Sequence, residues 1–247
     1  MNTKKLILII GSTGNIGREL VKQLVEKNEK VRVLTRDPAK AKMKFGTTVE
    51  IAEGDLSKPE TLDAAFVGVD KAFVLSPSLG PEFPELEGNA FIAAKKAGVK
   101  HIVKLSGFDV GMDFMADTPF VKWHSESEQR LRKIGVAWTI LRPHFFDSNL
   151  IEFGIIPRGG LFLPTGNGKE APIDPQDIAA VVVKVLTTSG HEGEIYELTG
   201  PELLSFTELV QKVSNITGKP LKFVDVPEET WREEMLNFVR LIWQVYG

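Results

Sequence analysis

A glycine-rich segment near the N-terminus has the composition of a phosphate-binding loop. It lies between the apolar run Leu6–Ile10, which predicts a buried strand, and Asn15–Lys27, whose apolar residues recur at helical spacing. Glycines at such a turn let backbone N–H groups approach a pyrophosphate, and the N-terminus of the helix adds positive partial charge. The loop reads Gly11-Ser12-Thr13-Gly14-Asn15-Ile16-Gly17.

The glycine spacing, G-x-x-G-x-x-G, differs from the G-x-G-x-x-G dinucleotide fingerprint, and a plain structural turn is the alternative interpretation. The position between a strand and a helix favours dinucleotide binding. After the next predicted strand, Val31–Thr35, come Arg36 and Asp37. A guanidinium here can pair bidentately with a ribose 2′-phosphate, whereas an inward-facing Asp37 would favour NAD. We predict NADP(H) in preference to NAD(H), with Arg36 as the discriminator; an exposed arginine opening a short helix is the alternative.

Short β-branched runs alternate with amphipathic segments through the first 140 residues. Strands that are apolar on both faces and separated by helices imply a parallel sheet covered on both sides, and right-handed crossovers make it a doubly wound, Rossmann-type sheet. One helix is expected to begin at Ser57 as N-cap, with Pro59 in its first turn. The other strands are predicted at Val49–Ala52, Lys71–Leu75, His101–Leu105 and Ala137–Leu141, and the later helices at Glu82–Ala97 and Phe120–Ile134.

The regular alternation of predicted strands and helices becomes less clear beyond Pro143, where turn-forming residues become frequent. We therefore predict an α/β chain with an NAD(P)-binding core over residues 1–150 and a smaller substrate-side α/β lobe over residues 151–247, interleaved with the core as one structural domain. The terminal helix carries an apolar face, which is either core or the surface of a homodimer. The predicted elements of this part are the helix Asp177–Leu186, a last sheet strand Glu194–Leu198, the helix Phe206–Thr217, the strand Leu221–Val226 and the helix Glu228–Tyr246.

Composition excludes several classes of protein. The 247 residues are 43% hydrophobic and 26% charged, which is typical of a globular enzyme and not of a disordered or fibrous chain. A net charge of −3 argues against broad binding to the nucleic acid backbone, which needs clustered positive charge. The absence of cysteine excludes disulfides and thiolate chemistry. The longest apolar run is too short for a membrane span or signal peptide, so we expect no membrane partner and a cytoplasmic location.

Several segments resemble the atypical short-chain dehydrogenase/reductases of the NmrA-like group, in particular the quinone and triphenylmethane-dye reductase branch. The resemblance extends over roughly residues 5 to 200. It implies an NAD(P)-binding fold in which Asp55 and Leu56 meet the adenine, while the loop from Ser76 and Pro77 lies beside the ribose next to the nicotinamide. The matching segments are Gly11–Gly17, Val33–Arg36, Glu53–Leu56, Val74–Pro77, Leu105–Gly107, Thr139–Pro143, Pro164–Gly168 and Ile173–Ala179.

Typical short-chain dehydrogenases use a Tyr-x-x-x-Lys pair to pass a proton to the substrate oxygen. Neither tyrosine of this chain, Tyr196 or Tyr246, is followed by such a lysine. The resemblance places Phe120 at the tyrosine position and His124 at the lysine position. His124 could donate a proton as an imidazolium, or hydrogen-bond the ribose or the acceptor carbonyl; a structural histidine is the equal alternative. Ser106, at the end of a predicted strand, is expected to donate a hydrogen bond to substrate.

Apolar side chains also follow the carboxyl ends of predicted strands, where open α/β sheets bind ligands. Phe145 and Phe146 follow one strand, and Phe114 follows another between two methionines. They suit a flat apolar acceptor, and simple packing of the lobe is the equal alternative. The histidines show no metal-binding spacing, so we predict no metal.

The sequence leaves two main candidate functions. The first is an NADPH-dependent reductase that transfers a hydride to a quinone or similar electron-poor conjugated acceptor, a small aromatic molecule whose reduced product needs no phenolic acid. The second is a non-catalytic NADP-binding redox sensor that reports to a protein partner, since the missing tyrosine is equally compatible with it. A reductase of a biosynthetic imine or enone is a third, weaker reading.

Overall fold

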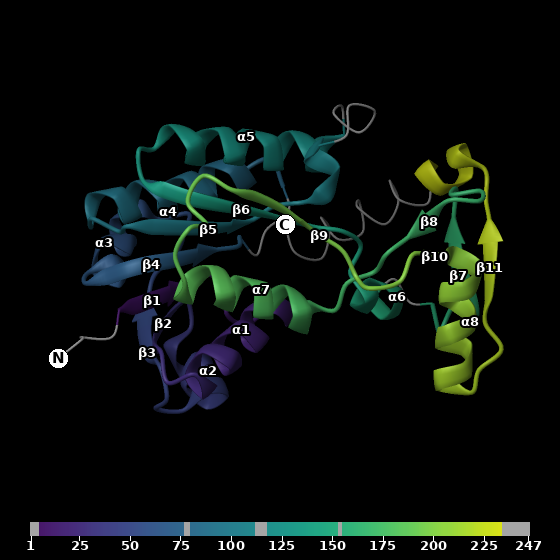
Figure 1. The fold of residues 1–247 in the computed structure, drawn as a ribbon, viewed down its shortest axis with the longest axis horizontal. Coiled ribbons are helices and arrows are strands. Elements are labelled where there is room, and N and C mark those ends of the chain that lie inside the picture. Colours follow the sequence, from purple (N-terminus) through teal and green to yellow (C-terminus); the bar gives the residue numbers. More distant parts are fainter. Residues whose placement is uncertain (1–4, 77–79, 112–117, 153–154, 234–247) are drawn as a thin grey trace. The chain divides into compact units, whose positions relative to one another are not determined.

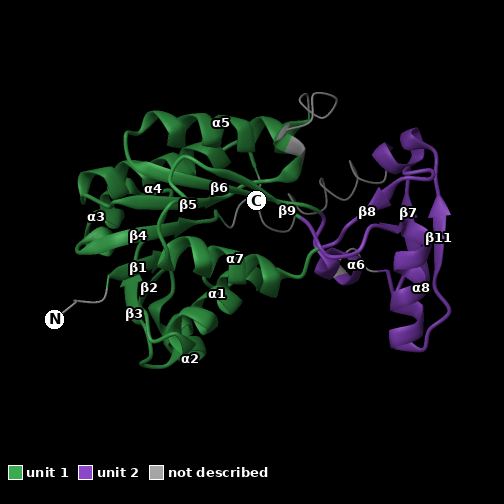
Figure 2. Cartoon of the chain, in the orientation of Figure 1, with its two compact units in different colours: residues 1–144, 173–198 green, residues 145–172, 199–247 purple. Residues whose placement is uncertain are grey.

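The computed structural model describes residues 5–76, 80–111, 118–152 and 155–233. The chain divides into two compact units (Figure 2). The first comprises residues 1–144 and 173–198, and the second residues 145–172 and 199–247. The division therefore falls at Phe145 instead of after residue 150, and residues 173–198 return to the first unit.

A seven-stranded parallel sheet forms the first unit, in the order β3-β2-β1-β4-β5-β6-β9. The predicted doubly wound Rossmann-type sheet is confirmed, because the first six strands have the 3-2-1-4-5-6 order of that fold. The strands are β1 (Leu6–Ile9), β2 (Lys30–Thr35), β3 (Glu50–Glu53), β4 (Val69–Val74), β5 (His101–Leu105), β6 (Ala137–Pro143) and β9 (Ile195–Leu198).

Helices cover both faces of this sheet (Figure 1). The helices α1 (Asn15–Glu26) and α7 (Pro175–Thr187) pack together on one face. On the other face, α4 (Phe83–Lys96) packs between α3 (Leu62–Phe66) and α5 (Pro119–Lys133). This burial on both sides explains why the strands are continuous apolar runs.

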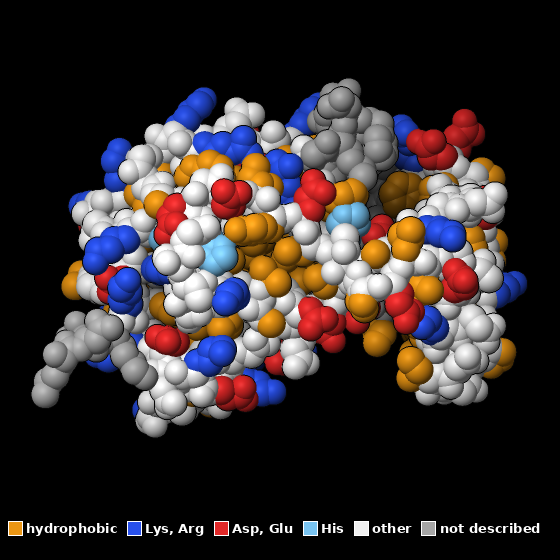
Figure 3. Space-filling view, in the orientation of Figure 1, with side chains coloured by type: hydrophobic (Ala, Val, Ile, Leu, Met, Phe, Trp, Pro, Cys, Tyr) orange, Lys and Arg blue, Asp and Glu red, His pale blue; other side chains and the backbone are white. Residues whose placement is uncertain are grey.

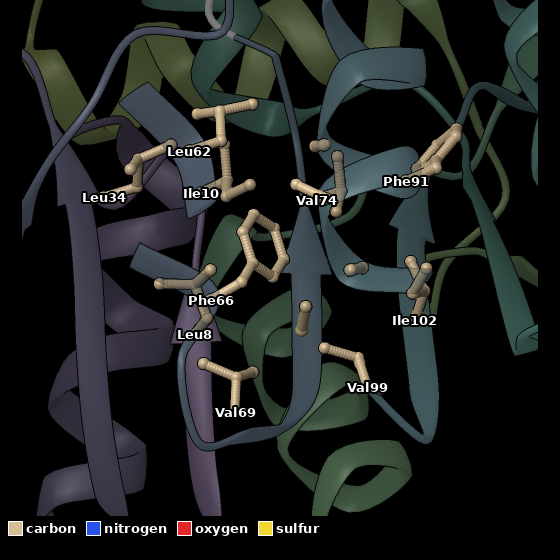
Figure 4. Packing of buried hydrophobic residues seen from close by; sticks show 14 of the residues in the cluster. Leu8, Ile10, Leu34, Leu62, Phe66, Val69, Val74, Phe91, Val99 and Ile102 are labelled. Carbon is tan, nitrogen blue, oxygen red and sulfur yellow. The ribbon is translucent and has the colours of Figure 1, made fainter. Parts of the chain in front are cut away.

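The larger core cluster lies under α3, α4 and α5. Figure 4 shows Phe66 at its centre, with Leu8, Ile10 and Val69 around the ring. Phe66 and Leu8 are fully buried. A substitution such as Phe66→Ala would cost about 3–5 kcal/mol by the usual scale for large buried aromatics, so this cluster is a main source of stability for the sheet.

One local prediction was wrong. The segment after Ser57 is a 3₁₀ turn, Pro59–Thr61, followed by the short α3, and Ser57 caps neither. The backbone N–H and hydroxyl of Ser57 instead donate to Oδ1 of Asp55, at 2.9 and 2.8 Å. In addition, α2 (Pro38–Phe45) follows β2 directly, with Asp37 as its N-cap.

The second unit has its own small core, built around Leu150, Ile155, Phe206 and Val210. Its helices are α6 (Asp147–Glu152) and α8 (Phe206–Thr217), and residues 228–233 are also helical. The strand β7 (Gly160–Leu163) pairs in parallel with β11 (Lys222–Asp225), and β8 (Lys169–Glu170) pairs with β10 (Leu204–Ser205). The rest of the predicted terminal helix, with its proposed dimer face, lies outside the described residues.

Acidic and basic side chains are interspersed on the face shown in Figure 3. Among the helices of the described part of the chain, none has the length and hydropathy needed to span a bilayer.

Candidate active site

The glycine-rich loop connects β1 to α1 in a close turn. Gly11 has a φ of +81°, and a Cβ on it would lie 2.6 Å from the carbonyl oxygen of Leu75. A Cβ on Gly17 would lie 2.1 Å from the carbonyl oxygen of Gly11. Gly14 differs, because the nearest atom to its Cβ position would be 3.6 Å away. Protein packing therefore requires glycine at 11 and 17, whereas at 14 it leaves room that a ligand can use.

Two observations show that an anionic group fits this loop. The N-cap of α1 is Gly14, which has no side chain to cap the helix, and the first turn of α1 holds no acidic residue that would offset its positive end. The hydroxyl of Ser12 is buried and has no hydrogen-bond partner among the residues that the structure describes. A buried hydroxyl without a partner is costly, and a phosphate oxygen would satisfy it.

Basic side chains surround the same loop. Lys44 donates a hydrogen bond from Nζ to the carbonyl of Thr13 at 2.8 Å, and partial burial, with the nearby Arg18 and Lys40, lowers the pKa of Lys44. Arg36 is exposed at the end of β2. Oδ1 of Asp37 accepts from the N–H of Lys40 at 2.9 Å and caps α2.

The residues predicted to meet the adenine follow β3. Leu56 is buried in the core cluster. Asp55 is half-buried, and its pKa is lowered, first by the hydrogen bond from the N–H of Ser57, with a smaller contribution from Arg36. Oδ1 of Asp55 thus organises its own turn, and a role toward adenine remains a prediction. Ser76 is buried after β4, and Pro77 lies outside the described residues.

The sequence-based reasoning missed a buried ion pair beside Ser106. Lys104 of β5 and Glu87 of α4 are both fully buried, with Nζ 2.9 Å from Oε2. Ser127 of α5 donates its hydroxyl to the same carboxylate, and the N–H of Ser76 donates to Oε1 at 3.3 Å. A lysine inside the apolar run of β5 was the available signal, since a buried lysine almost always has a partner.

Ser106 belongs to a second carboxylate group next to this pair. Its hydroxyl donates to Oε1 of Glu128 at 2.7 Å, and Glu128 also binds Arg142 at 2.7 and 3.0 Å and Arg132 at 2.8 Å. Burial raises the pKa of Glu128, but the hydrogen bonds from Arg142 and Ser106 outweigh it and the pKa is lowered. Because the single hydroxyl proton of Ser106 is directed at Glu128, the predicted donation from Ser106 to substrate is not what this structure shows.

His124 lies between these two groups on α5. Its Nδ1 is 3.3 Å from Nζ of Lys104 and 3.5 Å from the hydroxyl of Ser106, and its ring packs against the rings of Phe83 and Phe120. Burial, and then the charge of Lys104, lowers the pKa of His124 to about 2. The predicted imidazolium donor is therefore wrong, because the ring is neutral near pH 7. A neutral hydrogen-bonding role is what this environment allows.

The predicted substrate residues are not brought together by the described structure. Phe145 and Phe146 begin the second unit, where Phe145 packs edge-on against Phe206 at 6.5 Å. Phe114 lies outside the described residues. The ring of His144 packs against Phe108. Among the described residues, no group of three His, Asp or Glu side chains is arranged to hold a metal ion.

The parallel sheet, its strand order and the glycine-rich turn at the positive end of α1 define a dinucleotide-binding protein of the Rossmann class. Residues 3–243 match the NmrA-like family. The chain belongs to this family.

Curated relatives cover nearly all of the chain. It is 39% identical over 232 residues to an NAD(P)H azoreductase of Xenophilus azovorans, a match that covers 93% of this chain and 80% of the relative. It is 29% identical to quinone oxidoreductase 2 of Escherichia coli, over 90% of this chain and 78% of the relative. Because curated relatives this similar are named an NAD(P)H azoreductase and a quinone oxidoreductase, the chain is an NAD(P)H-dependent oxidoreductase that uses a nicotinamide cofactor.

Solved structures agree with this assignment. The NADPH complex of an E. coli NADPH-dependent quinone oxidoreductase superposes with a TM-score of 0.81 at 27% identity, covering 90% of this chain and 79% of the other. The Citrobacter sp. triphenylmethane reductase complexed with NADP(H) has a TM-score of 0.80 at 25% identity, covering 94% and 82%.

Proposed function

We propose that this oxidoreductase prefers NADPH and transfers a hydride to a quinone or a similar electron-poor conjugated acceptor. The observation that carries the proposal is the environment of His124: an uncharged imidazole beside Phe120, with no phenol, occupies the face where the resemblance places the proton relay of alcohol dehydrogenases. Such a site suits acceptors whose reduced products are stabilised and take a proton from water.

The cofactor supplies the hydride when it is bound. The amides at the start of α1 and the Ser12 hydroxyl are suited to hold its diphosphate. Arg36, with Lys40 and Lys44 nearby, offers positive charge suited to a ribose 2′-phosphate, and Asp37 is occupied as the cap of α2. These features favour NADPH over NADH.

The names of the relatives support this acceptor class. They act, by name, on azo compounds, quinones and triphenylmethane dyes, and a further relative, at 36% identity, is named a (4-alkanoyl-5-oxo-2,5-dihydrofuran-3-yl)methyl phosphate reductase. These acceptors share an electron-poor conjugated system, which accepts a hydride without prior protonation by the protein.

A steady-state assay tests the proposal. NADPH oxidation is followed with a naphthoquinone, an azo dye and, as the control, a simple aliphatic ketone. We expect turnover with the conjugated acceptors and none with the ketone. Calorimetric binding of NADPH without turnover on any acceptor would instead support the NADP sensor, and turnover of the ketone alone would contradict the proposed acceptor class.

A further inference from the structure

The buried ammonium of Lys104 has a complete set of hydrogen-bond acceptors. An ammonium carries three N–H groups and no lone pair. Nζ lies 2.9 Å from the carbonyl oxygen of Leu105, 2.9 Å from Oε2 of Glu87 and 3.3 Å from Nδ1 of His124. The ring of Phe83 covers the same group at 5.2 Å. Each N–H thus has one acceptor, and the one facing His124 requires a lone pair on Nδ1.

A neutral imidazole has one N–H and one lone pair, so the state of one nitrogen fixes the other. The ring is neutral because of burial and Lys104, and Nδ1 accepts from the ammonium. The proton is therefore on Nε2. The hydroxyl of Ser106, 3.5 Å from Nδ1, does not compete, because its proton goes to Glu128 at the shorter distance of 2.7 Å.

We infer that Lys104 is a positioning residue that holds His124 as the Nε2–H tautomer, and that this N–H donates a hydrogen bond to the electron acceptor. The recipient is a carbonyl oxygen or azo nitrogen of an acceptor of the proposed class, so the inference rests on the proposed function. A neutral imidazole whose N–H polarises a substrate carbonyl is established chemistry in triosephosphate isomerase. Here burial, and then the charge of a lysine in place of a helix terminus, keeps the ring neutral.

Glu87 makes this arrangement possible. A buried ammonium without a counter-charge is strongly disfavoured, because an apolar surrounding destabilises the charged form. The carboxylate balances that charge and is itself held by Ser127 and the N–H of Ser76. Among the described residues, the neighbouring carboxylate of Glu128, on α5, pairs with Arg142 of β6 at 2.7 Å and with Arg132 at 2.8 Å. Lys104 is thus the charged group that sets the tautomer of the His124 ring.

Nitrogen-15 NMR of the histidine rings tests the tautomer without any turnover. A His124→Gln variant assigns the signal among the four histidines. We expect a pyridine-like Nδ1 and a pyrrole-like Nε2 for His124, with no titration between about pH 5 and 8. A pyrrole-like Nδ1, or an imidazolium at neutral pH, would overturn the inference while leaving NADPH-dependent reduction untouched.

Two lysine variants separate this effect from general loss of structure. Lys71, on β4, is the matched control, because burial and then the charge of Lys71 lower the pKa of His101, as burial and then Lys104 lower that of His124. Lys104→Met should mix the tautomers of His124, raise its pKa and lower kcat by at least about tenfold, less than the ~10²-fold loss of a whole donor, with KM for NADPH unchanged. Lys71→Met should change the titration of His101 alone.

An unchanged His124 spectrum in folded Lys104→Met would refute the positioning role. If that variant does not fold, the wild-type spectrum decides: an accepting Nδ1 supports the inference and a protonated Nδ1 overturns it. Absence of turnover on every acceptor, with the expected tautomer present, would instead refute the proposed function.

Discussion

The ammonium of Lys104 lies 2.9 Å from the carboxylate of Glu87, and neither side chain reaches the solvent. The two residues come from β5 and α4, and the pair ties together the loop after β4, through the N–H of Ser76, and the helix α5, through Ser127 and His124. These elements carry the predicted nicotinamide side of the site. A charged pair is thus placed where a Rossmann sheet normally has apolar packing.

The pair should be strongly coupled in stability. Glu87→Leu alone leaves a buried ammonium without its counter-charge, and we expect the free energy of unfolding to fall by about 3–5 kcal/mol. Adding Lys104→Leu should restore much of that loss, because two apolar side chains then pack without charge. Urea denaturation of the single and double variants measures the difference. Simple additivity of the two single losses would contradict a coupled pair.

The same substitution should weaken NADPH binding at one glycine of the phosphate loop and destabilise the fold at another. Gly14→Ala places a methyl group 3.6 Å from the nearest protein atom, so thermal stability should change little while NADPH affinity falls by about tenfold or more. Gly17→Ala places it 2.1 Å from the Gly11 carbonyl and should destabilise the fold. Melting curves and calorimetric titration separate the effects. If Gly14→Ala bound NADPH with wild-type affinity, the ligand would not approach there.

Arg36 should distinguish the two cofactors. Arg36→Ala removes a charged hydrogen-bond donor to the 2′-phosphate, so NADPH affinity should fall by about 10–100-fold, equivalent to ~1.4–2.8 kcal/mol. NADH affinity should stay within about twofold, because NADH lacks that phosphate. Lys133→Ala, an exposed position on α5, is the matched control and should change neither. An unchanged cofactor preference would show that Arg36 does not discriminate between NADPH and NADH.

Stability should fall below neutral pH because of His124. Its pKa is about 2 in the fold and near 6.5 when unfolded, so the unfolded state binds the extra proton in that window. The stabilising contribution is complete above pH 6.5 and is lost as pH falls toward the folded pKa. Between pH 7 and 5 the loss is about 2 kcal/mol. His124→Gln should reduce this dependence; an equally steep dependence in that variant would assign it elsewhere.

The cofactor loop could be predicted from the sequence because its residues are contiguous. Gly11, Gly14 and Gly17 lie between one strand and one helix, and backbone geometry alone makes that arrangement an anion site. The role of Ser57 was misjudged because a cap and a bond to Asp55 compete within two residues, and the sequence does not rank such local alternatives.

The linear sequence was enough to determine a parallel α/β sheet and its phosphate loop, since both depend on local periodicity and on adjacent residues. The tertiary structure decided the chemistry of His124. Its neutral state depends first on burial and then on the charge of Lys104, twenty residues away on another element. The charge of Lys104 is in turn balanced by Glu87 from a third element. Burial and electrostatic interaction act through space, so only the packing of β5 against α4 and α5 could reveal them.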